Sequence, residues 1–221
     1  MNRFLKHFPI ALALLLTVLT ASAQNEPRIQ LRAGGGFAVY GTRNTLTYSF
    51  ANGVKFTSTE EDAAATLHIP IEVRYAFSKR FNAGLDLKFG SYLYEPDSAE
   101  GKSNGFTVIA LTAEYSLIAR EQFRWYVSLG LNTARLRLRE TNTLTQVVTE
   151  ADYGGGGYRL ATGTLVFFSS RLGLNVHLGM DSHNFKLDAF RIDGQAQNLN
   201  GFTGTLETGG LDGGIGLVVR L

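Results

Sequence analysis

The feature that most constrains the fold is a strict period-two alternation of apolar and polar residues. From Leu67 to Phe77 every second residue is apolar, and the intervening residues from His68 to Ala76 are mostly polar or small. A strand places these two sets on opposite faces, whereas a helix would mix them. The pattern therefore predicts a strand with one apolar face.

The same unit recurs along the chain and predicts eight strands. The predicted strands are Arg28–Tyr40, Leu67–Phe77, Phe81–Gly90, Ile109–Leu117, Phe123–Asn132, Tyr158–Phe168, Leu172–Asp181 and Leu211–Leu221. No stretch of useful length has the 3.6-residue period of an amphipathic helix. We therefore expect an all-β chain.

The connections between these strands alternate in length. Tight turns are predicted near Lys79, Glu121 and Ser170. Long connections, rich in Gly, Asn, Thr and acidic residues, are predicted at about 41–66, 95–105, 140–157 and 184–201. In the first of them, Ala51-Asn52-Gly53 has the composition of a hairpin turn between two further extended segments. The glycine run at 154–157 is predicted to lie in a flexible outer loop, because the strand-to-helix context of a phosphate-binding loop is missing.

Eight alternating strands must close on themselves or leave edges exposed, and an up-and-down barrel satisfies this requirement. A lipocalin-like barrel would turn its apolar face inward, whereas an outer-membrane barrel turns it toward lipid. The second arrangement is favoured by the alternation of short and long connections and by charges in the middle of the polar face. These charges are Glu72, Arg74, Asp86, Lys88, Glu114 and Asp212. Inside a narrow lumen they can form an ion-pair network that plugs the barrel.

The N-terminal segment has the composition of a secretory signal peptide. Arg3 and Lys6 precede an apolar run from Ile10 to Leu19, which is too short to span a membrane, and Ala21-Ser22-Ala23 is a small-x-small cleavage site. We therefore predict a signal peptide at residues 1–23 and one domain, the barrel, at 24–221. Without the leader's two cations, the basic and acidic residues balance, which does not support a nucleic-acid partner.

Several motifs are similar to those of the PorT-like outer-membrane β-barrel domain family. They are the glycine-rich Leu31-Arg32-Ala33-Gly34-Gly35-Gly36, the step Leu67-His68-Ile69-Pro70-Ile71, Tyr75-x-Phe77 before a turn, and Gly84 in the next strand. The resemblance covers nearly all of the chain after the leader. It implies an eight-stranded transmembrane barrel in a Gram-negative outer membrane, in most members without an assigned role.

Candidate chemistry outside the lumen is sparse. Arg135, Arg137 and Arg139 form a basic comb on one face and suggest either contact with lipopolysaccharide phosphates or solvated charge on a strand that extends beyond the membrane. His183 with Ser182 is the pairing on which a lipid-modifying enzyme would depend, but no spacing supports it. The acidic residues at 60–62, 97 and 100 lack the regular spacing of a calcium loop. The absence of cysteine excludes disulfides and thiolate chemistry.

These observations predict a monomeric outer-membrane barrel with a structural or surface-interaction role, without catalytic residues, metal or cofactor. Its expected partners are outer-membrane lipid, lipopolysaccharide and, during insertion, the barrel-assembly machinery. Two alternatives stay open at this point. One is a small ligand-binding or narrow transport barrel, and the other is a lipid-modifying outer-membrane enzyme.

Overall fold

The computed structural model describes residues 28–50, 52–94, 104–142 and 145–221. The predicted signal peptide at 1–23 lies outside the described residues. The strands are β1 (Ile29–Ser49), β2 (Lys55–Ala76), β3 (Phe81–Tyr94), β4 (Gly105–Ala119), β5 (Phe123–Thr141), β6 (Val148–Phe167), β7 (Leu172–Ile192), β8 (Gln195–Ala196) and β9 (Phe202–Arg220). No helix in the described part is long and apolar enough to cross a membrane.

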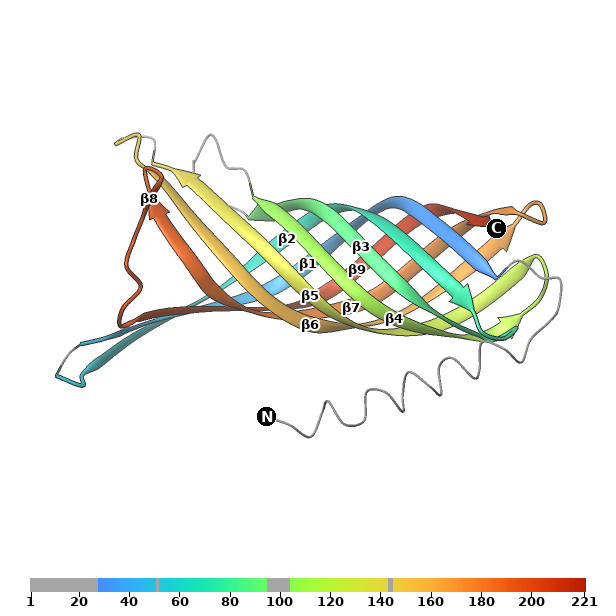
Figure 1. The fold of residues 1–221 in the computed structure, drawn as a ribbon, viewed down its shortest axis with the longest axis horizontal. Helices are drawn as coiled ribbons and strands as arrows, with labels where there is room; N and C mark the ends of the chain where they lie inside the picture. The colour runs from blue at the N-terminus through green and yellow to red at the C-terminus, as the bar shows by residue number, and fades with distance from the viewer. Residues whose placement is uncertain (1–27, 51, 95–103, 143–144) are drawn as a thin grey trace.

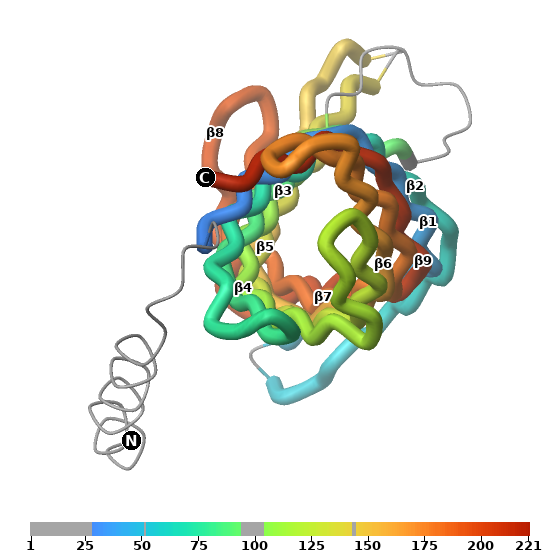
Figure 2. The backbone as a smooth tube through the Cα atoms, turned by 90° about the vertical axis from the view of Figure 1, so that its right-hand side faces the viewer, coloured from blue at the N-terminus to red at the C-terminus, as the bar shows by residue number. Residues whose placement is uncertain are grey.

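Eight long strands form a closed antiparallel barrel. From β1 to β7, each strand pairs with the next one in the sequence. β8 is a two-residue strand paired to the end of β7, so the next long strand, β9, pairs with β7 and closes the ring against β1. Figure 2 shows this closure in a view along the barrel. The predicted fold class, an all-β up-and-down barrel of eight strands, is therefore confirmed. Closure leaves no free edge along the body of the barrel, which isolated β-sheets cannot avoid.

The two ends of the barrel differ. At one end, here called the short-turn end, the tight turns predicted near Lys79, Glu121 and Ser170 join the strands. The C-terminus lies at this end (Figure 1). At the opposite end, here called the long-loop end, the β1–β2 hairpin projects beyond the other strands (Figure 1). Its turn contains Asn52 and Gly53, as predicted, and Gly53 adopts a φ of 84°, which favours glycine.

The predicted loops at the long-loop end were too long. β1 and β2 remain paired from Tyr40↔Ala64 out to Ser49↔Lys55, so most of residues 41–66 are strand. The glycines at 154–157, predicted to be a flexible loop, lie within β6 between β5 and β7. In β5, β6 and β7 the longer strands carry inward apolar side chains that bury one another, as described below. The segment 95–103 and residues 143–144 lie outside the described residues.

The outer surface of the barrel carries a continuous apolar belt. Along β1 the outward residues from Ile29 to Val39 are apolar or small, and along β2 those from Ala65 to Tyr75 are. The outward side chains of Leu111 and Leu131 are 65% and 68% exposed. Roughly eleven residues at ~3.3 Å each, tilted by ~45°, span about 25 Å, the height of the apolar band of membrane barrels.

The polarity of the two faces reverses at the long-loop edge of this belt. In β5, Leu129 and Leu131 point outward within the belt, whereas Leu136 points inward and is 1% exposed. In that upper part, the outward positions are the arginines at 135, 137 and 139. Such a reversal is expected where a barrel leaves lipid and its outer face meets water. The direction of the side chains therefore marks the outer limit of the apolar belt.

Candidate functional site: the barrel lumen and its outer mouth

The lumen near the short-turn end holds a cluster of five charged side chains, here called the lower cluster. Its members are Arg32, Glu72, Arg74, Asp86 and Glu114, and each is at most 4% exposed. Arg32 binds both oxygens of Glu114, at 2.8 and 3.0 Å. Arg74 pairs with Asp86 and with Glu72, the latter at 3.2 Å. These bonds join β1, β2, β3 and β4 across the lumen.

The lower cluster contains three carboxylates and only two guanidinium groups. Neutral donors satisfy part of the excess acceptor capacity. Asn82 donates from its amide to Glu114 at 2.9 Å, and the hydroxyl of Thr112 donates to Asp86 at 2.8 Å. Buried charges are tolerated when they are paired and hydrogen-bonded, and each charged side chain of this cluster has at least one ion-pair partner.

A second group of charges, here called the upper cluster, lies farther toward the long-loop end and is centred on Asp212 of β9. Lys88 donates to Asp212 at 3.0 Å and to Asp181 at 2.7 Å. Arg159 donates to Asp212 at 2.5 Å, and its Nε lies 3.4 Å from Asp181. Two cations and two carboxylates thus tie β3, β6, β7 and β9 together, and Asp212 is fully buried.

Two histidines complete the upper cluster. The Nε2 atoms of His68 and His177 each lie 3.3 Å from an oxygen of Asp212. Glycines make room for both rings. A Cβ atom on Gly36 would lie 2.4 Å from the His68 ring, and one on Gly214 would lie 2.7 Å from the His177 ring. The glycine-rich β1 and β9 therefore serve the packing of the lumen.

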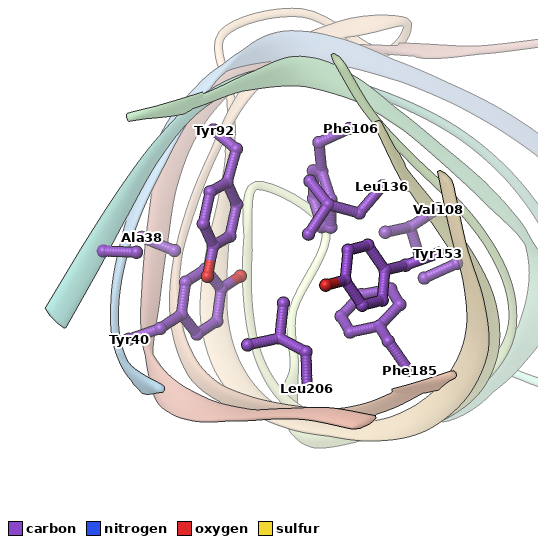
Figure 3. Packing of buried hydrophobic residues seen from close by; sticks show 11 residues of the cluster. Ala38, Tyr40, Tyr92, Phe106, Val108, Leu136, Tyr153, Phe185 and Leu206 are labelled. Atoms are coloured by element: carbon purple, nitrogen blue, oxygen red, sulfur yellow. The ribbon is translucent and has the colours of Figure 1, made fainter. Parts of the chain in front are cut away.

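Apolar layers lie on both sides of the charged clusters. Toward the short-turn end, Tyr126, Leu165, Phe167 and Val218 form a buried group. Toward the long-loop end there is a larger cluster, here called the apolar cap. Its buried members are Ala38, Tyr40, Ala64, Tyr92, Phe106, Val108, Ala134, Leu136, Tyr153, Phe185 and Leu206. Figure 3 shows these side chains pointing into the barrel from all around its wall. The lumen is thus filled by apolar, charged and apolar layers in turn.

A cavity of about 200 Å³ lies at the outer mouth, above the apolar cap. Tyr92, Tyr153 and Leu206 of the cap contribute to its lining, together with Leu138. Acidic residues lie around its rim. They are Glu60 and Asp62 of β2 and Glu140 of β5. Arg139 also lines the cavity, so three carboxylates and one guanidinium group surround its apolar floor and the rim is acidic on balance.

The structure brings all six predicted lumen charges into the barrel interior, where Glu72, Arg74, Asp86 and Glu114 join the lower cluster and Lys88 and Asp212 join the upper one. The prediction missed five partners, namely Arg32, His68, Arg159, His177 and Asp181. Their signal was present in the sequence, since each occupies an inward position of a predicted strand. The sequence analysis also did not predict the apolar cap, although the reversal of polarity along β5 indicates it.

The predicted basic comb lies on the outer surface, just beyond the apolar belt. Arg137 donates to Asp152 at 2.6 Å, and Arg139 lies 3.6 Å from Glu150. Arg191 also donates to Asp152, at 2.5 Å. Burial raises the pKa of Asp152, but the hydrogen bonds from Arg137 and Arg191 outweigh it and hold this pKa below its usual value. Two of the three arginines in the comb are thus neutralised within the protein.

The other predicted residues are not brought together as a catalytic site. His183 is buried in the lumen, where its ring stacks on Phe185 with centroids 5.6 Å apart, while Ser182 points to the opposite face of β7. Among the residues that the structure describes, no group of three His, Asp or Glu side chains is placed to hold a metal ion.

Comparison with solved structures identifies the fold. The chain is similar to the outer membrane protein OprG from Pseudomonas aeruginosa, with a TM-score of 0.58 and 13% identity over 90% of this chain and 99% of that one. It has the fold of an outer-membrane β-barrel. Weaker similarities, with TM-scores of 0.44 and 0.41, link it to the outer membrane protease OmpT from Escherichia coli and to Neisserial surface protein A. The identities are 10% over 91% of this chain and 100% of that one, and 12% over 84% and 97%.

No family model matches the chain, and no curated protein sequence matches it either. The resemblance to the PorT-like family therefore stays a prediction. At 13% identity, the similarity to OprG establishes the fold and carries no information on activity.

Proposed function

We propose that this chain is an integral outer-membrane barrel with a closed lumen, and that it acts through its outer surface. The observation that carries this proposal is the filling of the lumen by two ion-pair clusters between apolar layers. An eight-stranded barrel is only wide enough for its side chains to fill. A passage would require the simultaneous displacement of buried, ion-paired side chains and of the apolar cap.

Outer-membrane location is supported by the apolar belt and by the reversal of face polarity at its edge. A cation on the lipid face costs ~2–4 kcal/mol at the bilayer midplane and much less at the interface. The outward charges Arg43, Glu61 and Arg135 all lie beyond the belt. The long-loop end would then face the cell exterior, as is usual for barrels whose short turns are periplasmic.

Lipopolysaccharide contact is part of this proposal and centres on Arg135. Its neighbours in the comb are engaged by Asp152 and Glu150, whereas no ion pair of Arg135 is found among the described residues. It lies next to the belt, at the level of anionic lipid headgroups. A guanidinium group binds phosphate oxygens in a bidentate manner, which suits this position.

The location and orientation can be tested because the chain has no cysteine. Asn52→Cys places a single thiol in the turn of the β1–β2 hairpin, and Ser170→Cys places one in a tight turn at the opposite end. On intact cells, a membrane-impermeant maleimide should label the first variant and spare the second, and both should react after lysis. Labelling of Ser170→Cys alone would show that the orientation is the reverse. Equal labelling of both variants in a soluble fraction would contradict the membrane location.

A further inference from the structure

One strand of the outer extension has a partner on only one side. β1 pairs with β2 along its full length, out to Ser49↔Lys55. β3 pairs with β2 only as far as Ala64↔Tyr94. The segment Lys55–Ala63, here called the β2 edge, therefore has β1 on one side and no strand of the described residues on the other. Among the described residues, β3 ends at Tyr94 and β4 begins at Gly105, and the space beside the β2 edge above these two strands is here called the notch.

The register identifies which backbone groups point into the notch. Even-numbered residues of β2 bond to β1, as Ala76 N–H does to the carbonyl of Arg28, and the same parity holds at the hairpin, where Phe50 N–H donates to Val54. On the other side, Phe77 N–H donates to Phe81. Odd-numbered residues therefore turn their N–H and C=O groups away from β1. On the β2 edge these are Lys55, Thr57, Thr59, Glu61 and Ala63.

Exposed strand edges are a template for pairing with another chain unless they are blocked. The β2 edge contains no proline, and its pairing with β1 shows no register shift. Its blocking features are charges, and most of them are acidic. Glu61, on the outer face, is paired with Arg43 at 2.7 Å. Glu60 and Asp62, on the inner face, belong to the rim of the mouth cavity.

The edge and the cavity adjoin each other. A strand added alongside Lys55–Ala63 would lie in the notch between β2 and β5, and its inward side chains would project over the mouth cavity. There they would meet the carboxylates of Glu60 and Asp62 and, beneath them, the apolar floor at Tyr92 and Tyr153. An added strand is bound by its main chain and selected by every second side chain.

We propose that the β2 edge binds an extended, cationic peptide segment of a partner protein as an added strand. Its inward side chains are basic, so that their charged ends lie near Glu60 and Asp62 and their aliphatic stems lie over the cavity floor. The chain's own sequence at 95–103 does not have the composition of such a ligand, because it carries three acidic residues against one lysine and also contains Pro96. The proposal relies on the proposed function in one respect, namely that the long-loop end is exposed to partners outside the cell.

The test uses the full barrel in lipid nanodiscs and a fluorescein-labelled nonapeptide of alternating lysine and valine. We compare Thr59→Pro with Thr59→Val. Both variants lose the Thr59 hydroxyl, but only proline removes an N–H from the free edge, on the side away from β1. Wild type and Thr59→Val should bind the peptide with similar affinity, and Thr59→Pro should bind it about tenfold more weakly. Heat-modifiable gel migration checks that each variant is folded.

Three further measurements use the same assay. Glu60→Gln with Asp62→Asn should weaken binding several-fold and reduce its salt dependence. The peptide N-methylated at alternate residues should bind wild type at least tenfold more weakly, which tests strand addition without altering the protein. A glutamate–valine nonapeptide should not bind.

The proposal is overturned if wild type does not bind the lysine–valine peptide, if Thr59→Pro binds it as well as Thr59→Val, or if the glutamate–valine peptide binds equally. Binding that appears only after residues 96–102 are replaced by a glycine–serine linker would also overturn it, because the chain itself would then cover the edge. Nanodiscs expose both ends of the barrel, so this result is independent of the surface labelling that tests orientation.

Discussion

Replacing Asp212 with asparagine should destabilise the barrel strongly, because this carboxylate is the centre of the upper cluster. Asparagine keeps the shape of the side chain but removes the charge that Lys88 and Arg159 share at 3.0 and 2.5 Å. Breaking a buried ion pair by removing one partner costs ~3–5 kcal/mol. Lys88 and Arg159 still contact Asp181 in this variant. We therefore expect the free energy of unfolding to fall by about 3 kcal/mol, the lower end of this range, which changes the unfolding equilibrium constant by a factor of more than one hundred.

The assay is equilibrium urea unfolding in lipid vesicles, followed by the fluorescence of Trp125, the single tryptophan of the chain. The matched control is Glu207→Gln, because Glu207 is an acidic residue of the same strand, β9, with an exposed side chain. The control should stay within about 0.5 kcal/mol of wild type, as surface substitutions do. If Asp212→Asn also stays within that range, the upper cluster does not hold the strands together and the reasoning fails.

Two further predictions concern the surface. Trp125 lies on the outer face near the short-turn end and is 42% exposed. Its fluorescence should be quenched more strongly by lipids brominated near the headgroup than by lipids brominated deep in the acyl chain. If neither lipid quenches it, Trp125 lies outside the bilayer. Because the pKa of Asp152 is lowered in the folded state, its contribution to stability is complete above the ordinary carboxyl pKa of ~3.9 and is lost as pH falls through the folded value. Hydrogen exchange should therefore show that residues 148–157 of wild type lose protection as the pH is lowered below about 4. The variant Asp152→Asn should lack this protection already at pH 7. Equal protection of both proteins at pH 7 would contradict the stabilising role of Asp152.

The sequence allowed the closed barrel to be predicted because the outer belt and the lumen impose opposite polarity on alternate residues. Ile69 and Glu72, three positions apart in β2, show why this works: one faces outward and is 59% exposed, and the other is buried in the lumen. The tight turns followed from the same alternation. No knowledge of the partner strands was needed for either conclusion.

The predictions failed where the chemical environment changes along a strand. Beyond the belt, water replaces lipid, so residues such as Leu136 and Phe185 turn inward and the alternation reverses. The rule that apolar residues face outward assigned Phe185 to the long connection at 184–201, although β7 continues to Ile192. The pairing within the lumen was also out of reach, since Arg32 and Glu114 are 82 residues apart and meet only through closure of the ring. The sequence also could not show that, among the described residues, the β2 edge pairs on one side only, because this depends on where β3 ends.

The filled lumen is the central claim, and conductance of the purified wild-type barrel in a planar lipid bilayer tests it most directly. The two ion-pair clusters and the apolar cap predict a baseline without discrete channel steps at moderate voltage, for protein whose folded state is verified by heat-modifiable migration. Reproducible unitary conductance steps from the wild-type protein would show that ions pass the buried charges, and would contradict the account.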